Sequence, residues 1–213
     1  MPTDRPSLWR TDARTLARLL AGLWIFGTGD ALLILAALGN APWTVLAEGA
    51  SEQTGAGIGA WTIAISFLVL LAWIPLRQRP GLGTILNAIV IGVAIAVTLS
   101  LLGEPGQLGV RLVLVVVAIA MVGVGSGLYL TSRLGPGPRD GLMTGLHQRT
   151  GKSLRLIRTA LEVSVTAAGA LLGGTVGVGT LAFALLIGPA VQLFVGIGGG
   201  LSEGAAEDAY ERW

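Results

Sequence analysis

Apolar residues run along the chain in six blocks, each close to the length of a helix that crosses a membrane. The blocks are Leu19–Leu38, Ile58–Leu76, Leu82–Leu102, Leu112–Leu130, Ile157–Leu172 and Val178–Ile197. A spanning helix needs about 20 predominantly apolar residues. The pattern therefore predicts an all-α, polytopic membrane protein with six transmembrane helices and no room for a separate soluble domain.

The sequence also contains an internal repeat. A shift of 96 residues aligns 15–102 with 111–198 without a gap, so that "GTGDAL" at Gly27 lies over "GVGSGL" at Gly123 and "LGNAPWTVL" lies over "LGPGPRDGL". Each copy holds three predicted spans, which is an odd number, so the second copy enters the membrane from the opposite side. We therefore expect two inverted three-helix repeats, an architecture that recurs in secondary transporters.

A short helix is predicted after the first span of each copy. Both segments read Leu-Gly-x-x-Pro and end in Thr-Gly, and proline suits the first position of a helix while glycine suits its C-terminal cap. We predict these helices over 42–53 and 138–149, and four residues form their structural frame: Gly39, Pro42, Gly135 and Pro138. Neither helix is long enough to span. Each either lies in the membrane interface or dips inward, with its amino end facing an anionic ligand.

Charged residues make up only 12% of the chain, and their positions indicate how it sits in the membrane. A soluble protein carries roughly 25% charged residues. If the N-terminus is inside, every lysine and arginine except Arg111 falls on the cytoplasmic side. Both termini are therefore expected in the cytoplasm. The expected divisions are a cytoplasmic arm (1–18), the first repeat (19–102), an external linker (103–110), the second, inverted repeat (111–198) and an acidic cytoplasmic tail (199–213).

Polar side chains inside or beside the predicted spans mark a candidate solute or ion pathway, because ionisable groups are costly there. The candidates are Asp30, Asn87, Arg139, Asp140, Arg158, Glu162 and Gln192. The repeat alignment pairs Asp30 with Ser126, Thr44 with Asp140, Thr62 with Arg158 and Ser66 with Glu162. At each of these positions both copies are polar and only one is charged. We expect these positions to line a shared central cavity.

Structural roles stay open for several of these candidates. Arg158 can extend its head group to the cytoplasmic interface, and Glu162, four residues further on, can pair with it. Asn87 and Gln192 can form hydrogen bonds between helices. Asp30 has no cation near it in the sequence, so a functional role is favoured most for this residue.

The residue inventory argues against an enzyme. The chain has no cysteine and a single histidine, His147, and it shows neither a nucleophile elbow nor a phosphate-binding glycine-rich loop with lysine. The net charge of +2 reflects sidedness in the membrane rather than nucleic-acid binding. We expect no catalytic residue, cofactor or metal site. The expected partners are the lipid bilayer and an unidentified small solute, with homo-oligomerisation left open.

Several segments carry a resemblance to a known family. They include "RLLAGLWIFGTGDALLI", "LAWIPLRQRPGLGTILNAIVIG", "LGPGPRDGLMTGL" and "GGTVGVGTLAFALLIGPAVQLF". They resemble bacterial YczE-like integral membrane proteins of the YczE/YyaS/YitT group, from Arg18 to Phe194. The resemblance implies a multi-pass protein of the bacterial cytoplasmic membrane without an established substrate. The chain departs from the expected pattern at Thr44, where relatives are expected to carry an acid, and at Asp30, where they are expected to be apolar.

The repeat and the polar positions lead to one functional hypothesis and one alternative. The hypothesis is a secondary transporter or permease of a small polar or anionic solute, with Arg139, Asp140, Arg158 and Glu162 in the cytoplasmic half and Asp30 as a mid-membrane proton or cation site. The alternative is a non-transporting accessory or scaffold subunit that positions another protein. A polar cavity at the centre favours the first, and a tightly packed, dry centre favours the second.

Overall fold

The computed structural model describes residues 8–199, which form eight helices and no strand. The helices are α1 (Ala13–Ala36), α2 (Pro42–Thr54), α3 (Ile58–Leu76), α4 (Leu82–Leu101), α5 (Leu108–Leu130), α6 (Pro138–Thr150), α7 (Leu154–Leu171) and α8 (Val178–Gly199). Residues 1–7 of the predicted arm and the predicted tail from residue 200 onward lie outside the described residues.

Five of the described helices are long and apolar enough to cross a membrane, namely α1, α3, α4, α5 and α8. Helix α7 is not among them, although the sequence predicted a sixth span over Ile157–Leu172. Its 18 residues include three charged ones, Arg155, Arg158 and Glu162. The described chain is therefore an all-helical, multi-pass membrane protein with five candidate spans, and the sixth span stays a prediction.

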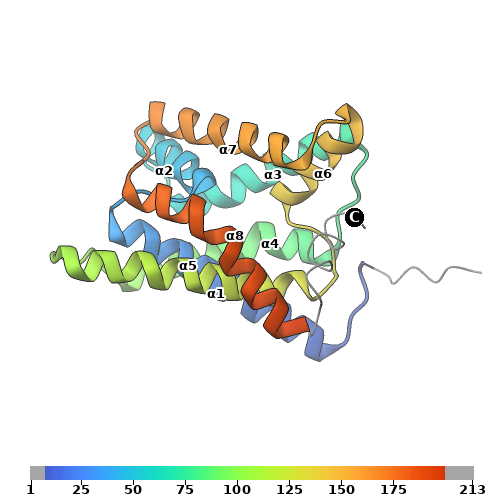
Figure 1. Cartoon of the computed structure of the whole chain (residues 1–213), viewed down its shortest axis with the longest axis horizontal. Coiled ribbons are helices and arrows are strands. Elements are labelled where there is room, and N and C mark those ends of the chain that lie inside the picture. The colour runs from blue at the N-terminus through green and yellow to red at the C-terminus, as the bar shows by residue number, and fades with distance from the viewer. Residues whose placement is uncertain (1–7, 200–213) are drawn as a thin grey trace, which may run out of the picture.

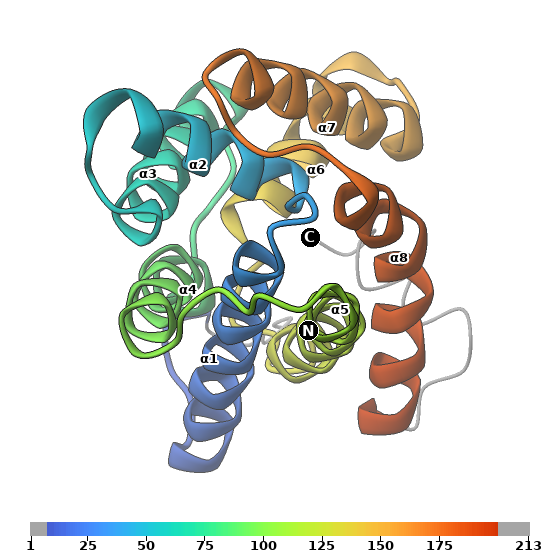
Figure 2. The ribbon, with the colours of Figure 1, turned by 90° about the vertical axis from the view of Figure 1, so that its left-hand side faces the viewer.

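The helices form two groups that lie side by side (Figures 1 and 2). Helices α1, α4, α5 and α8 make one group, in which α1 packs against both α4 and α5, and α5 packs against α8. Helices α2, α3, α6 and α7 make the other, in which α2 packs against α7 and α3 against α6. Contacts between α3 and α4 join the two groups. Since α2–α7 and α3–α6 each combine helices from different predicted repeats, neither repeat is a separate packing unit.

Glycines allow α1 and α5 to approach closely. A Cβ added to Gly22 would lie 2.9 Å from the carbonyl oxygen of Gly125, and a Cβ added to Gly125 would lie 2.6 Å from the carbonyl oxygen of Gly22. In a membrane, helices associate largely through such close packing of small residues, because lipid offers no hydrophobic driving force between them. A side chain at either position would push the two helices apart.

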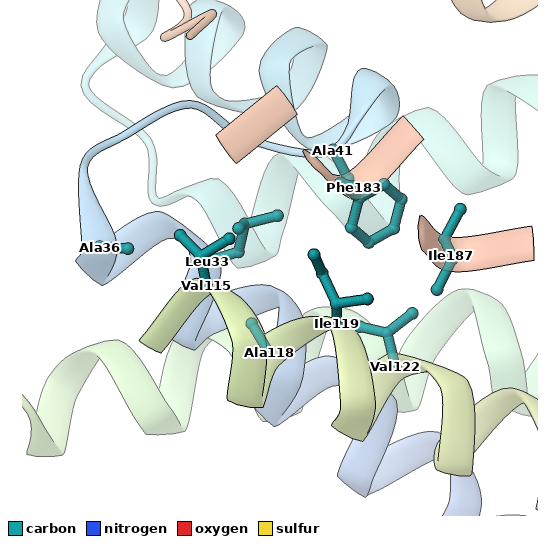
Figure 3. Packing of buried hydrophobic residues seen from close by; sticks show 9 residues of the cluster. All are labelled: Leu33, Ala36, Ala41, Val115, Ala118, Ile119, Val122, Phe183 and Ile187. Carbon is teal, nitrogen blue, oxygen red and sulfur yellow. The ribbon is translucent and has the colours of Figure 1, made fainter. Parts of the chain in front are cut away.

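An apolar cluster fills the space between α1, α5 and α8 (Figure 3). Its buried members are Leu33, Ala36, Ala41, Val115, Ala118, Ile119, Val122, Phe183 and Ile187. Ala41 belongs to the connection between α1 and α2 rather than to one of the three helices. The cluster therefore also fixes the position from which α2 begins.

The two short helices match each other in length and in both ends. Each has 13 residues, and they begin at Pro42 and Pro138. Each ends at a glycine with positive φ, 74° at Gly55 and 68° at Gly151, the usual left-handed C-terminal cap. Both helices are one residue longer than the sequence predicted.

The connections that lead into the short helices match as well. The carbonyl oxygen of Leu38 accepts a hydrogen bond from the backbone N–H of Gly179 at 2.7 Å. The carbonyl oxygen of Leu134 accepts one from the N–H of Gly83 at 2.8 Å. Both the donors and the acceptors are 96 residues apart, so each bond has an equivalent in the other half. Each bond also joins one half to the other.

A backbone conformation that favours glycine occurs in both connections, with φ of 110° at Gly39 and 114° at Gly135. We expect Gly39→Ala to lower the apparent melting temperature of the purified protein, because L-residues rarely adopt such a φ. An added Cβ would also lie 2.6 Å from Thr180 Oγ1. Gly57→Ala is the control, since Gly57 has a φ of −63° and open space around it. Equal melting temperatures for the two variants would contradict this account of the connection.

One helix contact is not repeated in the second half. Helix α3 packs against α4 where Gly59 meets Gly92, and a Cβ on Gly92 would lie 2.5 Å from Ile63 Cγ1. The residues equivalent to Gly59 and Gly92 are Arg155 and Gly188, and a Cβ on Gly188 would meet nothing. Arg155 is exposed, and α7 and α8 are not among the described helix pairs that pack closely.

Candidate functional site

The first turns of α2 and α6 are held inside the structure. Pro42, Trp43 and Thr44 are buried at the start of α2, and Pro138 is buried at the start of α6, whereas the last residues of both helices are exposed. In α6 the buried residues, Pro138, Gly141, Thr144 and Gly145, follow one side of the helix. The two predicted arrangements, interfacial and dipping inward, both stay predictions.

The two amino ends meet through Trp43 and Arg139. The Arg139 Cζ atom lies 5.3 Å from the centre of the Trp43 ring, which places the guanidinium over the ring in a cation–π contact. Each residue is the second of its helix, and the two are 96 residues apart. The contact therefore joins equivalent positions of the two halves.

Asp30 lies in α1 beside the first turn of α2. Its side chain is only 1% exposed, and its Oδ2 accepts a hydrogen bond from Thr44 Oγ1 at 3.4 Å. Its Oδ1 has no hydrogen-bond partner among the described residues. The cation that the local sequence does not supply comes from α6, because Arg139 interacts electrostatically with Asp30.

Asp140, which follows Arg139, is held by α5. Tyr129 Oη donates a hydrogen bond to Asp140 Oδ2 at 3.3 Å and accepts one from the backbone N–H of Gly137. Asn87 of α4 also lies beside Gly137. A Cβ added to Gly137 would lie 3.1 Å from Asp140 Oδ2 and 3.3 Å from Asn87 Nδ2. Tyr129 was not singled out from the sequence, because tyrosine near the end of a span is also a common interfacial residue.

Arg158 and Glu162 form the predicted pair on α7, with 2.9 Å between Nε and Oε1. The two side chains are 48% and 28% exposed, and exposed pairs with this spacing contribute only about 0.3–0.5 kcal/mol to stability. Both nevertheless belong to the site. Arg158 interacts electrostatically with Asp140, and Glu162 interacts with Arg139.

Burial opposes the charges on the first turn of α6. It raises the pKa of Asp140 above its usual value, while the nearby Arg158 and Arg139 act to lower it. It lowers the pKa of Arg139, and Asp30, Asp140 and Glu162 oppose that effect. A guanidinium nevertheless remains protonated in proteins. The site therefore contains two permanent cations among three carboxyl groups.

Six of the seven residues predicted from the sequence are brought together in this way. Gln192 is the exception, since it is exposed on α8 and makes no hydrogen bond with the site within residues 8–199. Thr62 and Ser66, the uncharged equivalents of Arg158 and Glu162, are buried but donate to the α3 carbonyl oxygens of Ile58 and Thr62, at 3.0 and 2.8 Å. Their hydroxyl groups bond to the backbone of their own helix, so they do not extend the charged group.

A second polar group, here called the Glu48 cluster, consists of Asn40, Glu48 and Thr175. Glu48 Oε2 accepts hydrogen bonds from Asn40 Nδ2 at 2.8 Å and from the N–H of Thr175 at 2.5 Å, and its Oε1 accepts one from Thr175 Oγ1 at 2.9 Å. These bonds tie α2 to the connection before it and to the α7–α8 connection. From the sequence, only the acid in the apolar first half of a short helix could have indicated this cluster.

We expect Glu48→Gln to lower the apparent melting temperature. The amide keeps the shape of the side chain but removes its negative charge, so its bonds become neutral ones. Bonds to a charged group contribute about 1.5–3 kcal/mol, against about 0.5–1.5 kcal/mol for neutral bonds. Glu52→Gln on the same helix is the matched control, because Glu52 is exposed and makes no hydrogen bond among the described residues. A melting temperature for Glu48→Gln equal to that of the control would show that the cluster does not hold α2.

An all-helical bundle with several apolar spans and a charged group where two short helices meet defines a multi-pass membrane protein with a polar centre. The chain belongs to the family described as "Family of unknown function (DUF6198)", which it matches over residues 13–196. The predicted resemblance to YczE-like proteins is confirmed.

Relatives in two bacteria match most of the chain. An "Uncharacterized protein" of Haemophilus influenzae is 47% identical over 191 residues, which cover 90% of this chain and 88% of that protein. The "Uncharacterized membrane protein YczE" of Bacillus subtilis is 31% identical over 170 residues, or 79% of each chain. "Uncharacterized protein YyaS" of the same bacterium is 25% identical over 180 residues, or 83% of this chain and 90% of its own length. No solved structure matches the chain.

Proposed function

We propose that this protein is a small secondary transporter that moves a small polar or anionic solute across the bacterial cytoplasmic membrane. The observation that carries the proposal is the charged group at the meeting point of α2 and α6, where Arg139 lies over Trp43 and interacts electrostatically with Asp30 and Asp140. Ionisable groups among membrane helices are costly, and they mark solute and ion pathways. Half-helices whose amino ends face the centre recur in transporter sites.

The proposal includes an inverted repeat, with α1–α4 and α5–α8 as its two halves, α7 as a sixth span and both termini in the cytoplasm. The shift of 96 residues relates the short helices, the connections before them and the Trp43–Arg139 contact, which supports a pseudo-two-fold relation. The Arg158–Glu162 pair supports α7 as a span, because pairing reduces the cost of placing charges in a membrane.

The distribution of the acids between the halves also supports a transport site that alternates between two conformations. The first half has Asp30 on its long helix and Thr44 on its short helix, and these two side chains are hydrogen-bonded. The second half has the reverse order, with Ser126 on the long helix and Asp140 on the short helix. Arg139 interacts with both acids. A cation that interacts with one carboxyl group from each half, at non-equivalent positions, is suited to a site that exchanges partners as the protein changes conformation.

A solute screen followed by uptake tests the proposal. Solutes that raise the melting temperature of the purified protein are offered to proteoliposomes that contain it. We expect saturable uptake, a loss of most of it in Asp30→Asn and in Glu162→Gln, and normal uptake in the control Glu52→Gln. Unchanged uptake in both site variants would remove the assignment of the site. Binding of solutes without any uptake would favour the alternative role, a non-transporting accessory or scaffold subunit.

A further inference from the structure

The transport site, whose existence rests on the proposed function, has donors and acceptors that select one ligand chemistry. We propose that it binds a carboxylic acid, as a monocarboxylate on Arg139 together with one proton shared with Asp30. The argument depends on which polar atoms of the site have partners and on the balance of charge around them.

Two donors at the meeting point of α2 and α6 have no acceptor. Within residues 8–199, the guanidinium of Arg139 donates no hydrogen bond to another residue, and its Cζ atom lies over the Trp43 ring. The indole Nε1 of Trp43 is buried and has no acceptor. A guanidinium presents its N–H groups as a planar fork that fits the two oxygens of a carboxylate. A planar oxyanion is therefore the ligand for which these donors are arranged.

One acceptor that interacts electrostatically with Arg139 also lacks a partner. Asp30 Oδ1 is buried without a hydrogen-bond partner, while Oδ2 of the same group accepts from Thr44. Asp30 and Arg139 interact electrostatically, but no hydrogen bond joins them in the described part of the chain. A group that accepts from Arg139 and shares a proton with Asp30 satisfies both partners. The carboxyl group of a small organic acid does this, since it carries acceptor oxygens and one acidic proton.

Charge balance argues that a proton accompanies the anion. Asp30 interacts electrostatically with Arg139, which also interacts with Asp140 of α6 and Glu162 of α7. Arg158 of α7 and Tyr129 of α5 interact with Asp140. The remaining charged residues described on α1, α2 and α5 are Asp12, Arg14, Arg18, Glu48, Glu52 and Arg111, and α4 and α8 have none among the described residues. The site thus has one carboxyl group more than it has guanidinium groups. The amino ends of α2 and α6 offset that excess with about half a positive charge each.

An added anion would break this balance unless a proton came with it. A monocarboxylate needs one proton, which Asp30 Oδ1 is placed to share. Inorganic phosphate with two negative charges needs more than one, so it fits the site less well. A neutral amide resembles the carboxyl group in shape but brings no proton to exchange. A monocarboxylate, phosphate and an amide therefore distinguish a site for a carboxylate with one proton from a site for other anions or for neutral ligands.

Isothermal titration calorimetry on the full chain in lipid nanodiscs tests the proposal. The probes are acetate and benzoate, with acetamide and inorganic phosphate as comparators, each titrated in buffers with different enthalpies of ionisation. We expect the carboxylates to bind with net uptake of protons approaching one per ligand. Their affinity should then fall by up to about tenfold per unit of rising pH, because the linked proton becomes scarcer. Any binding of acetamide should not depend on pH.

Two variants with matched controls complete the test. Arg139→Lys keeps the charge but loses the planar fork, and we expect it to weaken carboxylate binding about tenfold or more. Arg155→Lys on α7 is its control, because Arg155 is exposed. Asp30→Asn should remove the dependence of carboxylate affinity on pH, and Glu52→Gln should retain it. The number of protons taken up per ligand by the unmodified protein tests the proposal even if a variant fails to fold.

Three results for the unmodified protein would overturn the proposal. They are failure of the carboxylates to bind, carboxylate binding without proton uptake, and binding of phosphate or acetamide as tight as that of the carboxylates. An unchanged affinity in folded Arg139→Lys would overturn it as well. Carboxylate binding with no uptake into proteoliposomes would leave the ligand chemistry standing and remove the transport function. Uptake of a different solute, with no carboxylate binding, would leave the transport function standing and remove the proposed ligand chemistry.

Discussion

Arg139→Met is expected to abolish solute uptake and to destabilise the protein. Arg139 is the cation that interacts with both Asp30 and Asp140, so its loss leaves the buried Asp30 without a cation. Leaving a buried polar group without its partner typically costs about 1–3 kcal/mol. We expect a loss of about that size.

A second substitution separates this explanation from a simple loss of packing. If the damage comes from an unpaired carboxylate, Asp30→Asn combined with Arg139→Met should raise the melting temperature above that of Arg139→Met alone. If the damage comes from lost contact with Trp43, the double variant should be no more stable than the single one. Arg155→Met, at an exposed position on α7, is the control and should have little effect on stability or uptake.

Gly141→Val is expected to destabilise the fold by separating α3 from α6. A Cβ at position 141 would overlap the indole ring of Trp73, whose Nε1 donates a hydrogen bond to the carbonyl oxygen of Pro138 at 2.9 Å. Overpacking usually costs about 1–3 kcal/mol. The cost here is expected at or above the upper end, because a rigid, buried ring cannot move aside as a flexible side chain does. The melting temperature of the purified variant measures it.

The other half of the molecule suggests the compensating change. There the large and small residues are exchanged, since Val45 stands at the position equivalent to Gly141 and Gly169 at the position equivalent to Trp73. Gly169 packs against the backbone of Val45. Trp73→Gly combined with Gly141→Val recreates that arrangement and should be more stable than Gly141→Val alone. Gly188→Val, in a helical position with open space, is the control. A double variant that is less stable than Gly141→Val would contradict the exchange.

Much of the architecture could be predicted because it depends on local patterns. Apolar runs located the long helices, and the Leu-Gly-x-x-Pro frame located both short helices to within one residue. The predicted helix is present at α7, but its three charged residues keep it out of the candidate spans, so its role as a sixth span stays a prediction. A pattern of hydrophobicity alone does not reveal whether a neighbouring helix will compensate such charges.

The site could be predicted only in part, for a physical reason. Aligning the two halves identified Asp30, Asp140, Arg158 and Glu162 as related polar positions, and the structure brings these together around Arg139. The alignment did not indicate which side chains touch. The Trp43–Arg139 contact joins residues from different halves, so it depends on how the halves pack.

Packing between distant parts of the chain also explains two further differences, the Glu48 cluster and the position of Gln192. Glu48 is held by Thr175, 127 residues further along the chain, and no local pattern connects them. Gln192 lies in an apolar helix, as a site residue would, but it is on an exposed face. Helical periodicity shows which residues share a face without showing what that face meets.

The most direct test of the central claim is the initial rate of uptake into proteoliposomes of the solute that stabilises the purified protein most. The rate is compared between the unmodified protein, Arg139→Met and Arg155→Met, each reconstituted at equal density. We predict saturable uptake by the unmodified protein and by Arg155→Met, and none above empty liposomes by Arg139→Met. Equal rates in all three proteins, or no uptake by the unmodified protein despite solute binding, would contradict a transport site at the meeting point of α2 and α6.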